Sequence, residues 1–453
     1  MLKRYPVKEA SNTVRLNENL KLGPSGRVAK NRFLKASMSE HLGTWIDGDE
    51  VKSGIPTEQY INLYEKFGHG GFGLIVTGNI NVDINHLEGI GNVIIEERLD
   101  THERREGFRG VAQAAKSDGS LVVGQLNHCG SQTPIYLNPA PYSSSDIPID
   151  ADKAGQPFGK PIPLTIDQIR NDIIPKFVYG ANFLYKTGFD GIELHAATGF
   201  LLSQFLSPLY NNRTDEFGGS KENRVRIVLE LFEAIRKVIP AETGFIVGIK
   251  MNAVEYQDNG LTTEEAKWQA QQFEAIGFDF IELAGGNMEI HGLDTCAKPS
   301  IRKYETYYGD AAAIIKPAIP YTAVYLTGGF RTVPAMRAAL KDGIADGIGL
   351  GRPAAAEPDI AKKILKFNIQ SATINVLDDV TLQIVAAGTQ LVQAGTFSLG
   401  QSHQELCYGI FDTSNPAEAE KFMVAAADHF AVKRDEIAEG KKVNLSMKYA
   451  SFA

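Results

Sequence analysis

The chain has 453 residues, enough for one large α/β domain with additions or for two average domains. Hydrophobic residues make up 43% and charged residues 22%, which excludes global disorder because such a chain can bury a sizeable core. The net charge of −8 argues against a nucleic-acid partner, and no apolar run approaches the length of about 18 residues that predicts a membrane span.

The cysteines are few and scattered. Cys129, Cys296 and Cys407 form no CxxC pair, so the sequence offers no evident ligands for zinc or for an iron–sulfur cluster, and we expect no metal site. An odd, sparse set of cysteines is typical of a reducing compartment. No apolar run follows the charged N-terminal residues as it would in a secretory signal, so we expect a cytoplasmic protein.

Eight short apolar runs alternate with longer amphipathic segments along the chain. The runs are rich in Val, Ile and Leu, as is typical of parallel strands that are buried on both faces. The predicted strands are residues 32–37, 73–78, 120–126, 190–195, 245–251, 278–284, 323–329 and 345–351.

Helical signals lie between these runs, with Thr or Pro near several starts and Gly or Pro near several ends. Eight βα units in register predict a closed (β/α)8 TIM barrel over residues 1–370. A doubly wound open sheet is the alternative, but no GxGxxG motif follows the first strand. The predicted helices are residues 57–67, 101–116, 165–186, 222–238, 263–276, 304–319, 332–340 and 358–367.

Two segments do not fit the βα alternation. The loop 129–164, after the third strand, is long and rich in Pro, Ser and Asp, which is typical of a functional cap or of a disordered excursion, and we expect a cap. Residues 371–453 contain amphipathic pieces, and we expect a C-terminal extension that packs on the barrel or forms a contact between subunits of a homo-oligomer.

The last two strands end in motifs that suit an anion. In TIM barrels the loops after strands seven and eight commonly bind phosphate. Strand seven ends in TGGFR, where Gly328 and Gly329 allow backbone N–H groups to approach closely, and strand eight ends at Gly351 and Arg352. The planar guanidinium of Arg352 suits phosphate oxygens, and Arg331 is a second candidate. Either motif alone is also found in ordinary tight turns, but both lie where a phosphate site is expected.

The most distinctive segment surrounds His195, which ends the predicted strand DGIELH. The run HAATGFLLSQFLSPLYNNRTDEFGGSKENR that begins at this histidine resembles the old yellow enzyme (NADH:flavin oxidoreductase) family, and the resemblance spans about residues 15–365. It implies FMN bound in a TIM barrel, NADH or NADPH as the reductant, and a small-molecule acceptor. The absence of clustered cysteines and of a second nucleotide-binding domain makes this chain similar to the single-barrel form.

The resemblance implies flavin contacts at the tips of several strands. Relatives have Ala-Pro-Met/Leu-Thr/Cys at the first strand, where this chain has a serine, Ser37, in place of proline. Gln125 would pair with the flavin pyrimidine, and Lys250, which stands where many relatives have arginine, would stabilise negative charge at N1 and O2. The implied cofactor-binding residues are Ala36, Ser37, Met38, Ser39, Asn79, Gln125, Lys250, Gly328, Gly329, Gly351 and Arg352.

By the same resemblance, His195 and Thr198 donate hydrogen bonds to the oxygen of an acceptor stacked on the flavin, and they are the expected catalytic residues. The family usually has a tyrosine as proton donor at the position of Phe200, and a phenyl ring cannot donate a proton. His41 and Phe200 are expected to line the substrate pocket. We expect only a structural role for Glu193.

The proton donor is therefore open: water, Tyr142 or Tyr256 are the alternatives. The implied reaction is hydride transfer from NAD(P)H through flavin N5 to an electron-poor acceptor such as an α,β-unsaturated carbonyl. Three other hypotheses remain at this point: an oxidase-like or isomerising flavoprotein, a non-catalytic flavin-binding protein, and a flavin-free barrel acting on a sugar phosphate.

Overall fold

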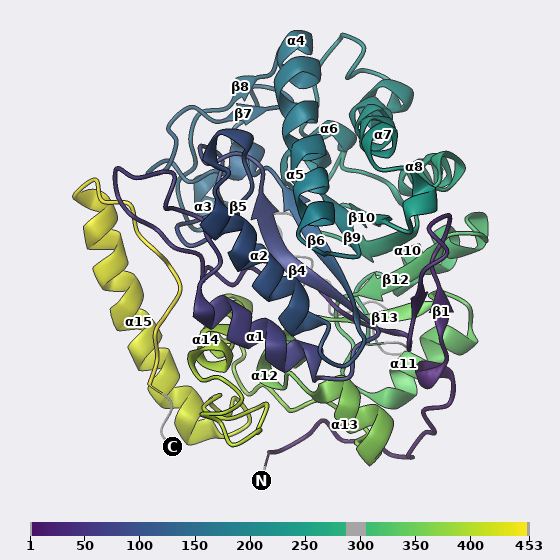
Figure 1. The fold of residues 1–453 in the computed structure, drawn as a ribbon, viewed down its shortest axis with the longest axis vertical. Coiled ribbons are helices and arrows are strands. Elements are labelled where there is room, and N and C mark those ends of the chain that lie inside the picture. Colours follow the sequence, from purple (N-terminus) through teal and green to yellow (C-terminus); the bar gives the residue numbers. More distant parts are fainter. Residues whose placement is uncertain (1, 287–304, 451–453) are drawn as a thin grey trace.

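The computed structural model, which describes residues 2–286 and 305–450, is built around a barrel of parallel strands with helices outside it (Figure 1). Neighbouring strands pair in register, and the pairing of β13 with β3 and of β3 with β4 closes the ring. The predicted (β/α)8 barrel is confirmed. Its strands are β3 (Phe33–Lys35), β4 (Leu74–Asn81), β6 (Leu121–Asn127), β9 (Gly191–Ala196), β10 (Ile246–Asn252), β11 (Phe280–Ala284), β12 (Ala323–Thr327) and β13 (Gly347–Leu350).

Most of the outer helices begin at a threonine or serine whose side chain accepts a backbone N–H, which satisfies one of the unpaired donors of the first turn. The helices that follow the strands, in order, are α1 (Glu58–Gly68), α2 (His102–Ala115), α5 (Ile174–Lys186), α7 (Lys221–Val238), α8 (Thr263–Ile276), α10 (Gly309–Ile315), α11 (Val333–Lys341) and α13 (Ile360–Phe367). Shorter helices include α6 (Leu201–Leu206) and α12 (Arg352–Ala356).

Two predicted helices differ from the structure. The segment 165–186 is divided into α4 (Ile166–Gln168), a π-helical turn (Ile169–Ile173) and α5, because Pro175 lacks the N–H that a continuous helix needs. The predicted helix 304–319 is shorter, since α10 begins at Gly309 and a single 3₁₀ turn follows it. Residue 304 lies outside the described residues, as does Cys296.

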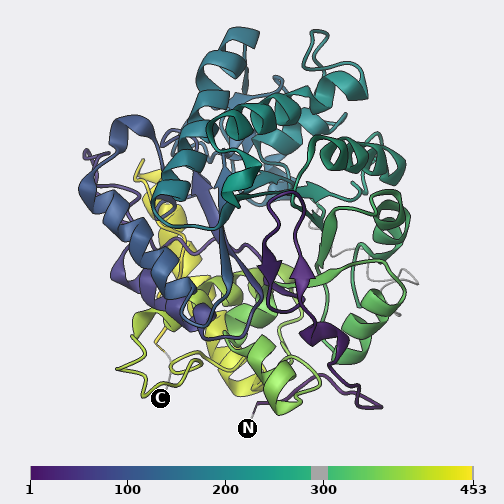
Figure 2. The same ribbon diagram turned by 45° about the vertical axis from the view of Figure 1, so that its right-hand side comes forward.

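A hairpin formed by β1 (Leu20–Lys21) and β2 (Val28–Ala29) covers the end of the barrel where the strands begin, and Figure 2 shows it in front of that opening. Leu20 and Leu22 belong to an apolar cluster with Phe280 and Tyr325 inside this end. A Cβ atom on Gly23 would lie 2.8 Å from the Cα of Asp279, so glycine is required for this close approach. Because this end is apolar and covered, the polar chemistry lies at the opposite end.

The residues after the barrel form two long helices, α14 (Val380–Thr396) and α15 (Pro416–Ala438). Helix α14 packs against α1, where Gln59 donates to the carbonyl of Val392 at 2.8 Å and Asn62 donates to that of Gly395 at 3.3 Å. Near the end of the chain, Asn444 donates to the carbonyl of His41 at 3.2 Å. The extension therefore reaches loops at the rim of the barrel. None of the helices in the described ranges has the length and hydropathy needed to cross a membrane.

Glu357 joins the N-terminus, the barrel and the start of the extension. Its buried carboxylate accepts hydrogen bonds from Arg4 at 2.6 Å, Lys363 at 2.8 Å and Thr373 at 2.6 Å. Burial by itself would raise the pKa of Glu357, but these partners outweigh it and lower the pKa to about 2. The ionised carboxylate therefore stabilises the folded protein.

We expect Glu357→Gln to lower the free energy of unfolding by about 3 kcal/mol near neutral pH, since one pKa unit corresponds to about 1.4 kcal/mol. The folded-state pKa of Glu357 is depressed, so its contribution is complete above about pH 4.5 and is lost as the pH falls toward about 2. Urea unfolding of both proteins at a series of pH values measures the difference. A difference that does not shrink below about pH 4.5 would show that the charge of Glu357 is not its cause.

Candidate active site

The polar strand ends meet at one rim of the barrel because the strands are parallel and in register. His195 at the end of β9 is the direct neighbour of Lys250 on β10, and Lys250 is the neighbour of Glu282 on β11. On the other side of β9, Gln125 of β6 faces Glu193. Residues separated by more than 150 positions in the sequence therefore share one small region, at the end of the barrel where TIM-barrel enzymes carry their chemistry.

Gln125 is held by two neighbours inside this rim. Its side-chain oxygen accepts from the hydroxyl of Ser37 at 2.6 Å, and its side-chain nitrogen donates to Glu193 at 2.7 Å. Ala36, just before this serine, is 1% exposed and donates its N–H to the carbonyl of Leu350 at 3.0 Å. These hydrogen bonds fix the end of β3 beside the side-chain amide of Gln125, which can present both a donor and an acceptor.

Lys250 lies in a buried cluster with two glutamates. Its Nζ is 3.3 Å from Oε1 of Glu282. Burial, together with the negative charge of Glu282, raises the pKa of Glu193 well above its usual range, which favours its protonated form. Glu282 is therefore the carboxylate whose negative charge balances the positive charge of Lys250. Glu193, for which the sequence predicted a structural role, and Glu282, which was not identified from the sequence, both lie in this cluster.

His195 is nearly buried, and its Nδ1 has no hydrogen-bond partner among the residues that the structure describes. Burial, and secondly the positive charge of Lys250, lower the pKa of His195 well below its usual range. The imidazole is therefore neutral near pH 7, with one N–H to donate. The ring of Phe200 packs against it edge to face, with centroids 4.7 Å apart. The two side chains predicted to face a substrate are thus in contact.

Thr198 lies in a strained turn that other side chains hold in place. Its φ of 55° is in the left-handed region, which is unfavourable for a β-branched residue. The N–H of Thr198 donates to Asn252 at 3.0 Å, and its carbonyl accepts from Gln132 at 2.7 Å. Asn252 and Gln132 were not identified from the sequence, although both lie at or just after strand ends. They fix the backbone from which the Thr198 hydroxyl projects.

A second set of predicted residues gathers around Glu88. Its carboxylate accepts from the hydroxyl of Ser39 at 2.6 Å and from the side-chain amide of Asn79 at 2.7 Å. Nε2 of His41 lies 4.0 Å from the same carboxylate. The sequence offered no signal for Glu88, because it lies in a loop with no strand or motif beside it.

The two motifs predicted to bind phosphate end neighbouring strands, β12 and β13. Gly328 and Gly329 have φ values of 115° and 102°, and a Cβ atom on Gly329 would lie 2.1 Å from the carbonyl oxygen of Glu305. Only glycine allows this backbone path. Gly351 is close to Met38, because a Cβ atom on Gly351 would lie 3.8 Å from the sulfur of Met38.

Two positive charges lie beside these glycines. Burial, followed by the charge of Arg331, lowers the pKa of Arg352. Arg331 donates from its guanidinium to the carbonyl of Phe330 at 2.8 Å. Two guanidinium groups close enough to affect each other, next to a glycine-rich backbone, are typical of a site for a doubly charged phosphate.

The residues present fit FMN. The unpartnered Nδ1 of His195 is a buried polar atom that a bound polar group would satisfy. Gln125 and Lys250 offer amide and cationic groups at one end, and Arg352 offers a cation at the other. The arrangement therefore separates a region for a polar ring from a region for a phosphate.

Asp83, His86 and His128 form a buried cluster that resembles a metal site. Nε2 of His86 accepts from the N–H of Tyr142 at 2.9 Å, and Nδ1 of His128 accepts from the N–H of Gly130 at 3.1 Å. Each neutral ring therefore carries its proton on the nitrogen that faces Asp83, where a metal would need a lone pair. Lys176 also donates to Asp83 at 2.6 Å. The cluster is a polar network around the Asp83–Lys176 ion pair, and its hydrogen bonds to Gly130 and Tyr142 anchor the loop of residues 129–164.

The two tyrosines named as substitute proton donors have other contacts. The ring of Tyr142 stacks on His86 with centroids 5.2 Å apart. The hydroxyl of Tyr256 donates to the carbonyl of Tyr307 at 2.9 Å. Neither contact brings a phenol to His195.

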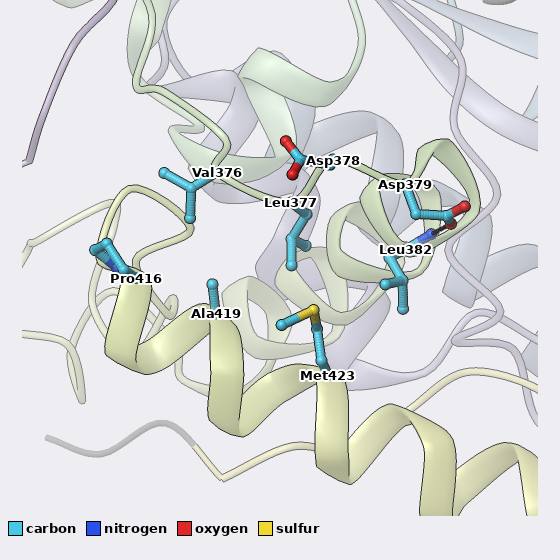
Figure 3. A pocket seen from close by; sticks show the side chains of 8 residues that line it. All are labelled: Val376, Leu377, Asp378, Asp379, Leu382, Pro416, Ala419 and Met423. Atoms are coloured by element: carbon cyan, nitrogen blue, oxygen red, sulfur yellow. Dashed lines mark hydrogen bonds between the residues drawn. The ribbon is translucent and has the colours of Figure 1, made fainter.

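A surface groove of about 380 Å³ lies in the C-terminal extension, away from the strand ends (Figure 3). Leu377, Leu382 and Met423 face one another across it. Its acidic residues, Asp378 and Asp379, lie at its edge, and no titratable group of the barrel rim reaches it. We therefore do not assign it to the site.

A TIM barrel with these groups at its strand ends is typical of a flavin-dependent oxidoreductase. The model of the NADH:flavin oxidoreductase / NADH oxidase family matches residues 18–370. The chain is 42% identical over 385 residues to the NADH-dependent flavin oxidoreductase nadA of Aspergillus parasiticus, covering 84% of this chain and 85% of that protein. It is 31% identical over 360 residues to the NADH-dependent flavin oxidoreductase iliE of Hypocrea jecorina, covering 76% and 87%.

Solved structures agree in fold. Morphinone reductase superposes with a TM-score of 0.64 at 21% identity, over 82% of this chain and 92% of that one. The old yellow enzyme homologue of Zymomonas mobilis superposes with a TM-score of 0.63 at 21% identity, over 80% and 95%. The chain belongs to the NADH:flavin oxidoreductase / NADH oxidase family, and it is an NAD(P)H-dependent oxidoreductase with FMN as its cofactor.

Proposed function

We propose that this enzyme reduces electron-poor small molecules, with α,β-unsaturated carbonyl compounds as the acceptor class. FMN, when bound, accepts hydride from NADH or NADPH and delivers it to the β-carbon of the acceptor. The observation that carries the proposal is the buried, neutral His195, whose unpartnered Nδ1 lies in the region that Lys250 and Gln125 share. A fixed, preorganised N–H donor stabilises the negative charge that develops on a carbonyl oxygen.

The remaining side chains hold the cofactor and the acceptor. Lys250 and Gln125 would contact the pyrimidine edge of the flavin, with Ala36, Ser37, Met38, Ser39 and Asn79 along the ring. Gly328, Gly329, Gly351 and Arg352 would bind the phosphate. Thr198 would donate a second hydrogen bond to the acceptor, and His41 and Phe200 would line its pocket. The proton for the α-carbon would come from water, since Phe200 has no acidic hydrogen.

A second candidate function is supported by Phe200 itself. Without a proton donor beside His195, hydride transfer to a carbon acceptor is slowed, whereas transfer of electrons to oxygen needs no positioned acid. An NADH oxidase of Thermoanaerobacter brockii is 30% identical over 74% of this chain, although the chain spans only 48% of that protein.

Anaerobic stopped-flow measurements separate the two functions. We expect the NADH-reduced enzyme to be reoxidised by cyclohexenone in the absence of oxygen. Reoxidation by oxygen alone, with no response to cyclohexenone or other enones, would overturn the proposal in favour of an oxidase.

We expect Lys250→Met to lower the two-electron reduction potential of the bound flavin by on the order of 50 mV, because the reduced cofactor loses a neighbouring positive charge. Glu282 would then be left as an uncompensated buried carboxylate, which lowers the potential further. Dye-coupled anaerobic titration measures the potential. The double variant Lys250→Met with Glu282→Gln is the control, and it should recover part of the loss; an unchanged potential in the single variant would place Lys250 away from the flavin.

A further inference from the structure

The C-terminal extension contacts the arginine that we assign to the cofactor phosphate. Nη1 of Arg352 donates to the side-chain oxygen of Gln383, on the first turn of α14, at 2.6 Å. The side-chain nitrogen of Gln383 donates to the carbonyl of Leu377 at 2.7 Å, so the amide is oriented with its oxygen toward the arginine. The guanidinium is therefore held by a residue that the sequence alone did not single out.

The small cavity beside this contact is lined by positive and neutral residues. Arg331 and Arg352 line one small cavity with Thr373, Gln383 and Gln390, and none of the described residues that line it is acidic. Because Gln383 is neutral, it orients Arg352 without cancelling its charge. A glutamate at this place would hold the guanidinium equally well but would weaken its attraction for an anion.

The extension has anchors of its own, remote from Arg352. Helix α14 is fixed to α1 through Gln59 and Asn62, and Gln393 joins its later turns to the chain end by donating to the carbonyl of Tyr449 at 3.0 Å. The match to the family model ends at residue 370, so Gln383 lies outside the shared barrel. Loss of the Gln383 side chain should leave the helix in place and release only the arginine.

We propose that Gln383 is a positioning residue for the cofactor phosphate, and that the C-terminal extension is thereby a part of the FMN site. This inference rests on the proposed assignment of Arg352 to the phosphate. Gln383 holds the guanidinium from one side and Tyr307 also bonds to it. Because arginine has five donors in a fixed plane, the remaining N–H groups are left to the phosphate oxygens.

The test compares FMN with riboflavin, which has the same ring system but no phosphate. The full-length protein, freed of flavin, is titrated with each ligand and the quenching of flavin fluorescence is followed. We expect Gln383→Leu to raise the Kd for FMN about tenfold and to leave the Kd for riboflavin unchanged. Gln383→Glu keeps an acceptor for Arg352 but adds a negative charge, and it should weaken FMN binding at least as much.

Gln393→Leu is the matched control, since it lies on the same helix but bonds only within the extension. It should leave the ratio of the two dissociation constants at the wild-type value. Equal weakening of FMN and riboflavin by Gln383→Leu, or no weakening of either, would overturn the inference. Gln383→Glu with wild-type FMN affinity would do the same.

Arg352→Leu separates this inference from the proposal on which it rests. If Arg352→Leu selectively weakens FMN while Gln383→Leu does not, the inference fails and the phosphate site stands. If Arg352→Leu also leaves the ratio unchanged, the phosphate site itself is misplaced and both are overturned.

Discussion

Replacing His195 with alanine should slow hydride transfer to an enone by about 100- to 1,000-fold, because the acceptor oxygen loses a preorganised hydrogen-bond donor. His195 is 6% exposed and lies beside Lys250. A water molecule that entered the space left by alanine would not be held in the position of the imidazole N–H. The rate at which the reduced enzyme is reoxidised by cyclohexenone, measured anaerobically by stopped flow, gives the effect directly.

His195→Asn is the matched variant for this prediction, since an asparagine amide retains an N–H donor and should recover a part of the rate. The pKa of His195 is held well below its usual value, so the imidazole stays neutral where an ordinary histidine titrates. We therefore expect no loss of wild-type rate from protonation of His195 as the pH falls through about 6.5. An unchanged rate in His195→Ala would exclude this residue from the reaction.

Replacing Phe200 with tyrosine should accelerate enone reduction by about 100-fold, the lower end of what a positioned general acid contributes. The ring of Phe200 is packed edge to face against His195, and a phenol there would be a proton donor beside the residue that polarises the acceptor. The same stopped-flow assay measures the gain. The reaction with oxygen, which needs no such acid, should change little.

Phe200→Leu provides the control, because it removes the ring without adding a donor and should give no gain. If Phe200→Tyr is no faster than the wild type, then proton delivery does not limit the reaction, and water already reaches the α-carbon.

The barrel could be predicted from the sequence because every strand is a short apolar run that is buried on both faces. The strand ends could also be located, since the apolar run stops where the polar residue projects, as at Gln125, His195 and Lys250. The π-helical turn before α5 was not predicted, because the apolar periodicity continues through Pro175 and only its missing N–H breaks the helix.

The parts of the site that were not predicted depend on contacts between distant segments. Glu88 holds Ser39 from a loop 49 positions away, and Gln383 holds Arg352 across 31 positions. No motif in the sequence marks Glu282 as part of the site, and only the register of the strands places it beside Lys250. Composition and spacing do not predict such contacts, because they form only when distant segments come together in the folded chain.

The crystal structure of the enzyme with FMN bound would test most directly whether these strand ends form one cofactor site. We expect the isoalloxazine to lie over the barrel with Gln125 and Lys250 at its pyrimidine edge, His195 beside the substrate position, and the phosphate at Gly329 and Arg352. Flavin bound elsewhere, or a phosphate that does not contact Arg352, would contradict the assignment of the site.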